Sequence, residues 1–536
     1  MSDRAPPGDS AVAVAGAPGD AVFGERTRKI ALGLIGAAVF VGLWELLARA
    51  GSLGLTVPPL TKILPAIGDN ASLLGRSAAA SVSRAAEGYA VGVSAAFLVG
   101  VVILLQPRLD AGVYRLAVVV NAIPVIAFGS LVEVVGLQSL TPMVFAAMLV
   151  FLTTLIAVTK GFQSGSAVIH DVLSALGASR WERLVRLQLP DAVPSIADGL
   201  RIAAPTAFVG ALLGEWFGAE RGLGVLLINA MRNFDVELMW ASALVAVAIS
   251  ASAYALLGGL ETLLVRRFAR TVQTRGVMTA DMPDTRSRAV RALSWPARFW
   301  AVGLVILAWQ LWISLGHVDR IVAPGPWNVV TYVAGHLGTY VVQGLITAEA
   351  AIGGLVLGML AGLGLAIAAW RSRILSGLIA PAVLVIPTVP IVVIIPVVAR
   401  LIGFNRWTVV VVAVLLSFFP VFVLATSGLR YRPAGADDVF SVLGASRWGR
   451  LRYLALPSAV PNLLTAVRIS SAACFLGALV AEWLVGTSGL GVVFRESRAL
   501  LQPERAWGAI VVGVFVSVAA YLLAYSAELR GRERWS

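Results

Sequence analysis

The sequence DVLSALGASRWERLVRLQLP, from Asp171 to Pro190, returns almost unchanged as DVFSVLGASRWGRLRYLALP, from Asp438 to Pro457. The two closing prolines are separated by 267 residues. The same spacing relates Gly177 to Gly444, Arg201 to Arg468, Glu215-Trp216 to Glu482-Trp483, and Trp240 to Trp507. A polar, arginine-rich segment that is kept in register with its neighbours indicates that the chain consists of two copies of one unit. Each copy presents the same polar surface.

The composition is that of a membrane protein. The 536 residues are 58% hydrophobic and 13% charged, with a mean hydropathy of +0.86, whereas a soluble domain carries about 25% charged residues. Apolar runs long enough to cross a bilayer recur along the chain. They predict an all-α, polytopic fold of two tandem six-helix units. The predicted spans are residues 30–50, 85–105, 116–135, 141–159, 199–217 and 241–260, then 299–316, 350–369, 378–399, 407–426, 467–485 and 508–526.

The net charge of +13 is distributed as in a membrane protein and not as in a nucleic-acid-binding protein. Basic residues fill alternate loops, beginning with Arg26 and Lys29 before the first span, while the loop around Gln138 is poor in them. This positive-inside pattern predicts a multi-pass protein of the cell (inner or plasma) membrane with both termini in the cytoplasm. Because six is an even number, the two units enter the bilayer in the same, parallel orientation. We expect no nucleic-acid partner.

The domain boundaries follow from the same pattern. Residues 1–25 are rich in Ala, Gly, Pro and Asp, and predict a disordered cytoplasmic tail and not a cleaved signal peptide. The stretch 266–298 is polar and basic, and predicts a cytoplasmic linker. The remaining predicted parts are the first unit at 26–265, the second unit at 299–530 and a short cytoplasmic tail at 531–536.

The repeated segment predicts a helix, a break, a second helix and a proline stop. Gly177 supplies a turn that other residues adopt only at a cost, and Ser179 is an expected N-cap of the second helix. Pro190 is expected to end that helix. On these physical grounds alone, an amphipathic helix pair lying on lipid headgroups and a docking site for another protein remain equally good interpretations.

The segments resemble the cytoplasmic motif of ABC importer permeases, which reads E-A-A-x-x-x-G and then I/L-x-L-P. Gly177 and Gly444 match the glycine, and Asp171 and Asp438 stand where that motif has glutamate. The form L-G-A-S-R-W at 176–181 and 443–448 is usual in the nitrate, sulfonate and taurine-type branch. The stretch VAEWLVGTSGLGVVF, from Val480 to Phe494, resembles that branch too, and LLGEWFGAERGLGVLL from Leu212 is its looser counterpart.

This resemblance implies a fused transmembrane subunit of an ABC importer. In that family the motif forms a coupling helix that sits in a groove of the ATPase subunit. The implied partners are two cytoplasmic ATPase subunits, an extracytoplasmic solute-binding protein and the lipid bilayer. The implied coupling residues are Asp171, Gly177, Ala178, Ser179, Arg180, Trp181, Leu189 and Pro190, with Asp438, Gly444, Ala445, Ser446, Arg447, Trp448, Leu456 and Pro457.

The chain itself lacks the residues for ATP hydrolysis. A Walker A loop needs Gly-Lys followed by Ser or Thr, and none of Lys29, Lys62 and Lys160 follows a glycine. The three histidines show no zinc spacing. We therefore expect no enzyme activity, no metal and no directly bound cofactor, with ATP used through the partner ATPase.

Polar residues within the spans are candidates for the translocation pathway, because such residues are costly in a bilayer. Glu215 and Glu482 each precede a tryptophan near the outer end of the fifth span. They are interpreted either as structural anchors that bond to the following segment ending in GLG, or as pathway or gate residues. Further pathway candidates in the third spans are Asn121, Pro124, Thr388 and Pro390, where a helix break would expose backbone to a cavity.

Asymmetry between the units also bears on the pathway. Glu45 and Glu133 of the first unit have Gln310 and Arg400 near the matching positions of the second, which suggests a route that is not truly twofold.

One rival class fits the span pattern. An ion- or proton-coupled secondary transporter also shows twelve spans in two parallel repeats, but it has no need of two matched cytoplasmic docking segments. The sequence does not define the substrate, because initial selectivity in such importers lies largely in the binding protein.

Overall fold

The part of the chain that the structure describes is all-helical, as predicted. The computed structural model describes residues 19–51, 57–106, 138–163, 172–173, 175–179, 182, 188–268, 296–316, 323–372, 374–376, 378, 390–431 and 435–535.

Most helices of the two units correspond in order, and six pairs differ in length by at most three residues. The first unit contains α1 (Gly19–Arg49), α2 (Leu60–Asp69), α3 (Ala71–Leu105), the 3-10 turn η2 (Gln138–Leu140), α6 (Thr141–Gln163), α9 (Leu189–Glu215), α10 (Leu223–Arg232) and α11 (Val236–Phe268). The second contains α13 (Pro296–Gly316), α14 (Pro326–Gly335), α15 (Leu337–Arg371), α17 (Ile391–Ile402), α18 (Arg406–Arg430), α19 (Ala436–Val442), α20 (Arg447–Arg450), the π-helical turn η6 (Leu451–Ala455), α21 (Leu456–Val485), α22 (Leu490–Ala499) and α23 (Pro503–Trp535).

Eight of the described helices are long and apolar enough to cross a membrane. They are α3, α6, α9 and α11 in the first unit and α15, α18, α21 and α23 in the second, and each overlaps a predicted span. α1 and α13 cover the predicted spans 30–50 and 299–316. The predicted span 116–135 lies outside the described residues. Of span 378–399, residues 378 and 390–399 are described, and α17 begins directly after Pro390.

Helix ends differ slightly from the predicted domain boundaries. α1 begins at Gly19, inside the predicted tail 1–25, and α23 extends to Trp535. Both extensions continue the amphipathic or charged helical sequence beyond the apolar run that defined the span.

Small residues allow the central helices of each unit to approach closely. α6 packs between α3 and α9, and α18 packs between α15 and α21. A Cβ added at Gly92 would meet the Ala147 carbonyl, and one added at Gly358 would meet the Val414 carbonyl. The same close helix contact is therefore built twice.

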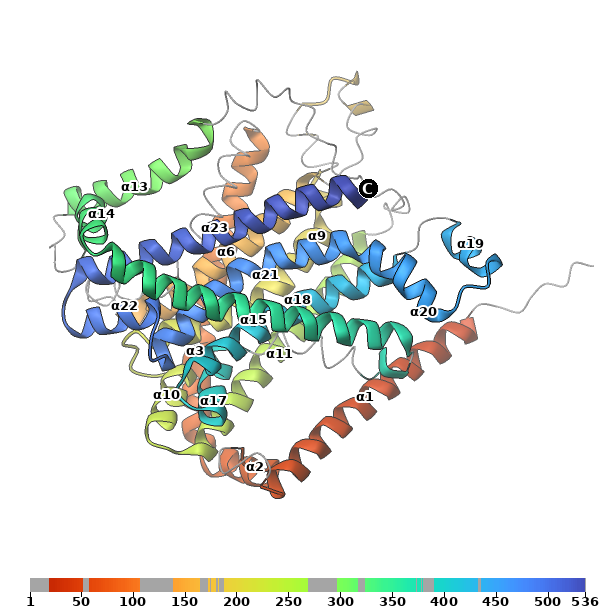
Figure 1. The fold of residues 1–536 in the computed structure, drawn as a ribbon, viewed down its shortest axis with the longest axis horizontal. Helices are drawn as coiled ribbons and strands as arrows, with labels where there is room; N and C mark the ends of the chain where they lie inside the picture. The colour runs from red at the N-terminus through yellow and green to blue at the C-terminus, as the bar shows by residue number, and fades with distance from the viewer. Residues whose placement is uncertain are drawn as a thin grey trace, which may run out of the picture.

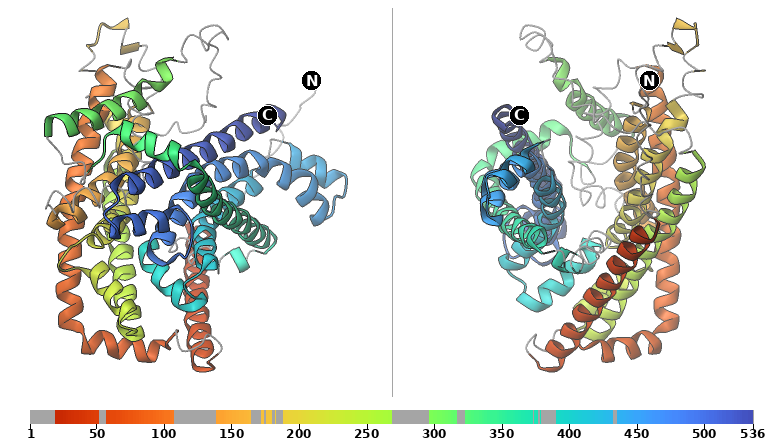
Figure 2. Two further views of the ribbon diagram at one scale, coloured as in Figure 1. Left: turned by 60° about the vertical axis from the view of Figure 1, so that its left-hand side comes forward. Right: turned by 90° about the vertical axis from the view of Figure 1, so that its right-hand side faces the viewer.

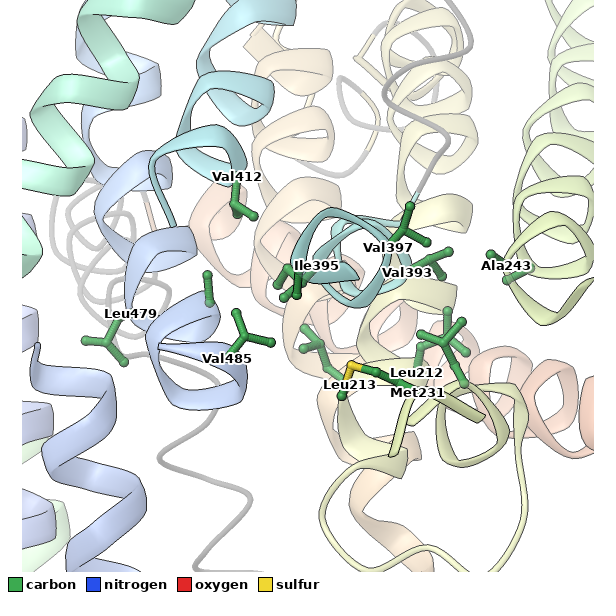
Figure 3. Packing of buried hydrophobic residues seen from close by; sticks show 14 of the residues in the cluster. Leu212, Leu213, Met231, Ala243, Val393, Ile395, Val397, Val412, Leu479 and Val485 are labelled. Carbon is green, nitrogen blue, oxygen red and sulfur yellow. The ribbon is translucent and has the colours of Figure 1, made fainter. Parts of the chain in front are cut away.

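The units meet along one side of the molecule, where α17 lies between them (Figures 1 and 2). α17 contacts α9, α10 and α11 of the first unit as well as α18 and α21 of its own. Figure 3 shows Val393 and Val397 of α17 directed toward Ala243 of α11, while Ile395 lies on the side of Val485. One continuous cluster of buried apolar residues includes side chains from both units.

Candidate functional site

The repeated segment of the second unit is a sharp, hydrogen-bonded turn between two short helices. α19 ends at Val442, and Gly444 two residues later has a φ of +61°, a left-handed conformation that glycine adopts without penalty. The Ala445 N–H donates to the Phe440 carbonyl at 3.0 Å, which is the long-range bond of a Schellman helix end. The Ser446 hydroxyl then accepts from the Gly449 N–H at 3.1 Å and caps α20. The segment is thus fixed by its own backbone.

The first unit builds the same turn. Gly177 has a φ of +76°, and the Ala178 N–H donates to the Leu173 carbonyl at 2.9 Å. The Ser179 hydroxyl accepts from the Glu182 N–H at 3.2 Å, and the Ser179 N–H donates to the Glu182 carboxylate at 2.9 Å. This reciprocal pair is a capping box, so the predicted N-cap at Ser179 is confirmed. Asp171, Arg180 and Trp181 lie outside the described residues.

Large apolar side chains project from both turns. Leu443 is 74% exposed and Trp448 63% exposed in the second unit, and Leu176 is 77% exposed in the first. Asp438, Ala445 and Arg447 lie at the surface beside them. Exposed apolar residues clustered among polar ones are typical of a protein-binding surface.

The predicted proline stop is wrong. Pro190 and Pro457 lie in the first turns of α9 and α21, where the missing N–H of proline is tolerated. In the second unit the helical run continues from Arg447 to Val485. The π-helical turn η6, directly before α21, shifts the hydrogen-bonding register and so lets the chain pass through Leu456-Pro457. The turn of the second unit is therefore joined directly to a helix long enough to span the membrane.

The two turns lie far apart in the molecule. In all three ribbon views the α19–α20 segment and the segment before α9 occupy separate corners, away from α10 and α22 (Figures 1 and 2). α10 and α22 follow the other ends of α9 and α21.

At that other end, Glu215 fastens the start of α10. Its side chain is 2% exposed, and it accepts from the Ser81 hydroxyl at 2.5 Å and from the Gly224 N–H at 2.6 Å. The Ser81 hydroxyl in turn accepts from the Leu223 N–H at 2.9 Å. The orphan N–H groups at the helix start are satisfied by a buried carboxylate.

Glu482 makes the equivalent contacts in the second unit. It accepts from the Thr347 hydroxyl at 2.8 Å and from the Gly491 N–H at 3.0 Å, and Thr347 accepts from the Leu490 N–H at 3.0 Å. A Cβ at Gly489 would overlap the Glu482 carboxylate, and its φ of +107° disfavours other residues. This requirement explains the first glycine of each GLG sequence.

The tryptophans that follow these glutamates meet between the units. The Trp216 and Trp483 rings stack with centroids 5.9 Å apart, and the Phe217 and Trp483 rings stack at 4.9 Å. Phe145 packs behind Phe217 at 5.5 Å. The Glu-Trp pairs are thus both buried anchors and the ends of an aromatic contact across the interface.

Of the remaining pathway candidates, Pro390 alone lies within the described residues. Asn121, Pro124 and Thr388 lie outside the described residues, and Pro390 is the buried residue before α17. Arg400 of α17 reaches the first unit, where it donates to the Met231 carbonyl and lies 4.1 Å from the Phe234 ring centroid.

Sequence reasoning missed two sets of partners. Ser81 and Thr347 differ in identity and are 266 residues apart, so the repeat spacing of 267 does not pair them. The second set is the ion pairs Arg201–Glu261, at 3.0 Å, and Arg468–Glu528, at 3.1 Å. Arg201 and Arg468 are 267 residues apart, and so are Glu261 and Glu528. This repeated spacing of an arginine and a glutamate is the sequence signal that could have predicted the ion pairs.

Long apolar helices arranged as two matched units, each with a capped turn at one end, define a membrane transport protein of the permease class. The family model described as "Binding-protein-dependent transport system inner membrane component" matches residues 88–270 and again residues 354–528, together more than half of the chain. The chain belongs to this family and carries its domain twice. It is a multi-pass inner-membrane protein and the permease component of a binding-protein-dependent ABC transporter, a system in which ATP is handled by a partner ATPase.

Curated relatives each correspond to about half of this chain. The formylaminopyrimidine transport permease protein ThiX of Halalkalibacterium halodurans is 27% identical over 225 residues, which cover 42% of this chain and 90% of the relative. The riboflavin transport system permease protein RibX of Chloroflexus aurantiacus is 28% identical over 270 residues, covering 48% and 99%. SsuC of Bacillus subtilis, named for aliphatic sulfonates transport, is 28% identical over 247 residues, covering 43% and 87%.

Proposed function

We propose that the two capped turns are the docking sites for two ATPase subunits, one for each permease unit. We define the coupling turns as residues 171–190 and 438–457. The observation that supports this proposal is their duplication: the same left-handed glycine, the same N-cap serine and the same exposed apolar residues stand at the start of α9 and of α21.

The local geometry suits a part that transmits force. The described part of each coupling turn is held by hydrogen bonds within the turn. The coupling turn of the second unit is also continuous with a long helix, so a displacement at this turn moves the helix instead of being absorbed in a loop. Nucleotide-driven approach of two ATPase subunits would draw the turns together and tilt the units, so that the pathway between them opens to alternate faces.

The coupling turns belong on the cytoplasmic side, with both termini. This orientation is supported by the basic residues in the first turns of α1 and in the last turns of α11 and α23. An extracytoplasmic solute-binding protein would then deliver substrate to the side of α10 and α22. Membership of a binding-protein-dependent family favours this arrangement over an ion-coupled secondary transporter.

We also propose that the importer belongs to the nitrate, sulfonate and taurine-type branch. The L-G-A-S-R-W sequence in both coupling turns and the Glu-Trp and GLG sequences support this assignment. Relatives named for sulfonates, formylaminopyrimidine and riboflavin suggest a small organic solute. Thermal-shift screening of the cognate binding protein against these compounds, taurine and nitrate tests the assignment. Stabilisation by an unrelated class, such as a sugar, would contradict it.

The docking proposal is tested by purifying the protein from its native membranes in mild detergent. We expect an ATPase to co-purify and transport in proteoliposomes to require ATP. Recovery of the chain alone, with transport that survives ATP depletion, would overturn the proposal.

A further inference from the structure

We propose that Trp216, Phe217 and Trp483 form the gate that closes the outer end of the translocation pathway. We call these residues the aromatic gate. The proposal rests on the proposed function in one respect, because it takes the coupling turns as the cytoplasmic, ATPase-driven ends of the two units.

The aromatic gate lies at the ends of two levers. α9 has 27 residues and α21 has 30, so at 1.5 Å per residue they are about 40 and 45 Å long. Each begins within a coupling turn; α9 ends at Glu215, directly before Trp216, and α21 ends at Val485, two residues after Trp483. A movement of the coupling turns relative to each other therefore acts directly on the separation of Trp216 and Trp483.

The Trp216 ring and the Trp483 backbone are each held by hydrogen bonds within their own units, and the rings stack on one another across the interface. The Trp216 indole donates to the Gly224 carbonyl at 3.2 Å. On the other side, Arg495 donates to the Trp483 carbonyl at 3.0 Å and to the Gly486 carbonyl at 3.1 Å. The Glu215 and Glu482 anchors fix the neighbouring helix starts. Each half of the gate is thus held within one unit, and the aromatic contact between the halves is ring stacking, which can open without breaking a hydrogen bond between those rings.

The gate is asymmetric. Phe217 of the first unit corresponds to Leu484 of the second. Arg495 of the second unit corresponds to Ile228 of the first. Trp483 consequently lies against two rings of the first unit, with interplanar angles of 29° to Trp216 and 10° to Phe217. The Arg498 guanidinium lies 6.0 Å from the Phe217 ring centroid. Trp483 is therefore the side chain whose loss should open the gate most.

The arrangement is that of a closed outer end and separated inner ends. The rings stack between the units at the side of α10 and α22, and the coupling turns lie far apart (Figures 1 and 2). Bringing the turns together should unstack the rings.

Crosslinking between the units tests this prediction. Cys474 is buried and donates to the Ala413 carbonyl, so Cys474→Ser gives a background that keeps this donor. Trp216→Cys and Trp483→Cys are then combined and treated with a short bifunctional methanethiosulfonate reagent in the assembled transporter. We expect efficient crosslinking without nucleotide, and about tenfold less after trapping with ATP, vanadate and binding protein, since trapping shifts the population to the outward-open state.

The matched control is the pair Trp309→Cys and Trp507→Cys. These rings also stack, at 4.8 Å, but both belong to the second unit. Their crosslinking should not change with nucleotide. A Trp216–Trp483 yield that is equally insensitive would overturn the gate, whereas loss of ATPase co-purification would instead contradict the proposed function.

A second measurement does not depend on introduced cysteines. Trp483→Ala should raise the ATPase activity measured without binding protein several-fold, because the closed state loses its ring contacts. Trp483→Phe keeps an aromatic ring, so its ATPase activity without binding protein should stay close to the wild-type level. Trp507→Ala should leave this activity unchanged. ATPase activity at the wild-type level in Trp483→Ala would overturn the proposal.

Discussion

Trp216 and Trp483, which occupy the same position in the two units, stack face to face with their ring planes inclined by 29°. Each follows a buried glutamate that fastens a helix start, and each ends a helix that begins at a coupling turn. α9 and α21 thus connect the coupling turn of each unit with its tryptophan at the interface.

The first prediction concerns the left-handed glycine of the coupling turn. Gly444→Val should lower the affinity for the ATPase about tenfold, because a side chain costs roughly 1–2 kcal/mol in this conformation and the turn will distort. The matched control is Gly51→Val: Gly51 has a φ of +69° and, like Gly444, has nothing within 4 Å of an added Cβ. Membrane insertion should be normal in both variants, as measured by protease protection. Equal ATPase binding in both variants would contradict the docking role.

The second prediction concerns the exposed tryptophan of the same turn. Trp448→Ala should weaken ATPase binding by about 2 kcal/mol, as expected for a tryptophan at the centre of an interface. Trp327 of α14 is also highly exposed but lies far from the coupling turn in sequence, so Trp327→Ala should bind the ATPase normally. Surface plasmon resonance on nanodisc-embedded protein measures both. A similar loss in both variants would point to general destabilisation instead of docking.

The third prediction concerns the hydroxyl beside Glu482. Thr347→Val removes one donor to the carboxylate and the acceptor of the Leu490 N–H, and leaving buried groups unpaired should cost about 2 kcal/mol of unfolding free energy. Ser497→Ala is the control, because the buried Ser497 hydroxyl donates to the Val493 carbonyl of its own helix. Thermal unfolding in detergent should rank Thr347→Val well below Ser497→Ala. The reverse order would exclude a stabilising role for this contact.

The fourth prediction compares a buried ion pair with an exposed one. Glu528 is 1% exposed and pairs with Arg468, whereas Glu349 is 65% exposed and pairs with Arg406. Glu528→Gln should destabilise the second unit by about 3 kcal/mol, because the partly buried Arg468 guanidinium loses its charged partner. Glu349→Gln should change stability by less than about 1 kcal/mol. Equal unfolding temperatures would show that the α21–α23 ion pair does not hold these helices together.

Much of the fold could be predicted because it depends on local sequence. Apolar run length predicted the spans, and the repeated glycine and serine predicted the coupling turn, since both residues act through the backbone next to them. The consequence of Pro457 could not be predicted in this way. A proline normally ends or kinks a helix, but the π-helical turn before it absorbs the change in register.

The buried contacts of the site join residues that are distant along the chain, so the sequence did not predict them. Ser81 lies 134 residues from Glu215 along the chain, and nothing in either local sequence connects them. The stacking of Trp216 on Trp483 depends on how the units pack, which the duplication itself does not determine.

The central claim is that one chain carries two equivalent ATPase docking sites. Native mass spectrometry of the complex released from nanodiscs tests it most directly. We expect one 56.1 kDa chain with two ATPase subunits, and loss of ATPase subunits from complexes in which Gly177→Val and Gly444→Val are combined. A wild-type complex with a single ATPase subunit or none, or full occupancy in the double variant, would contradict it.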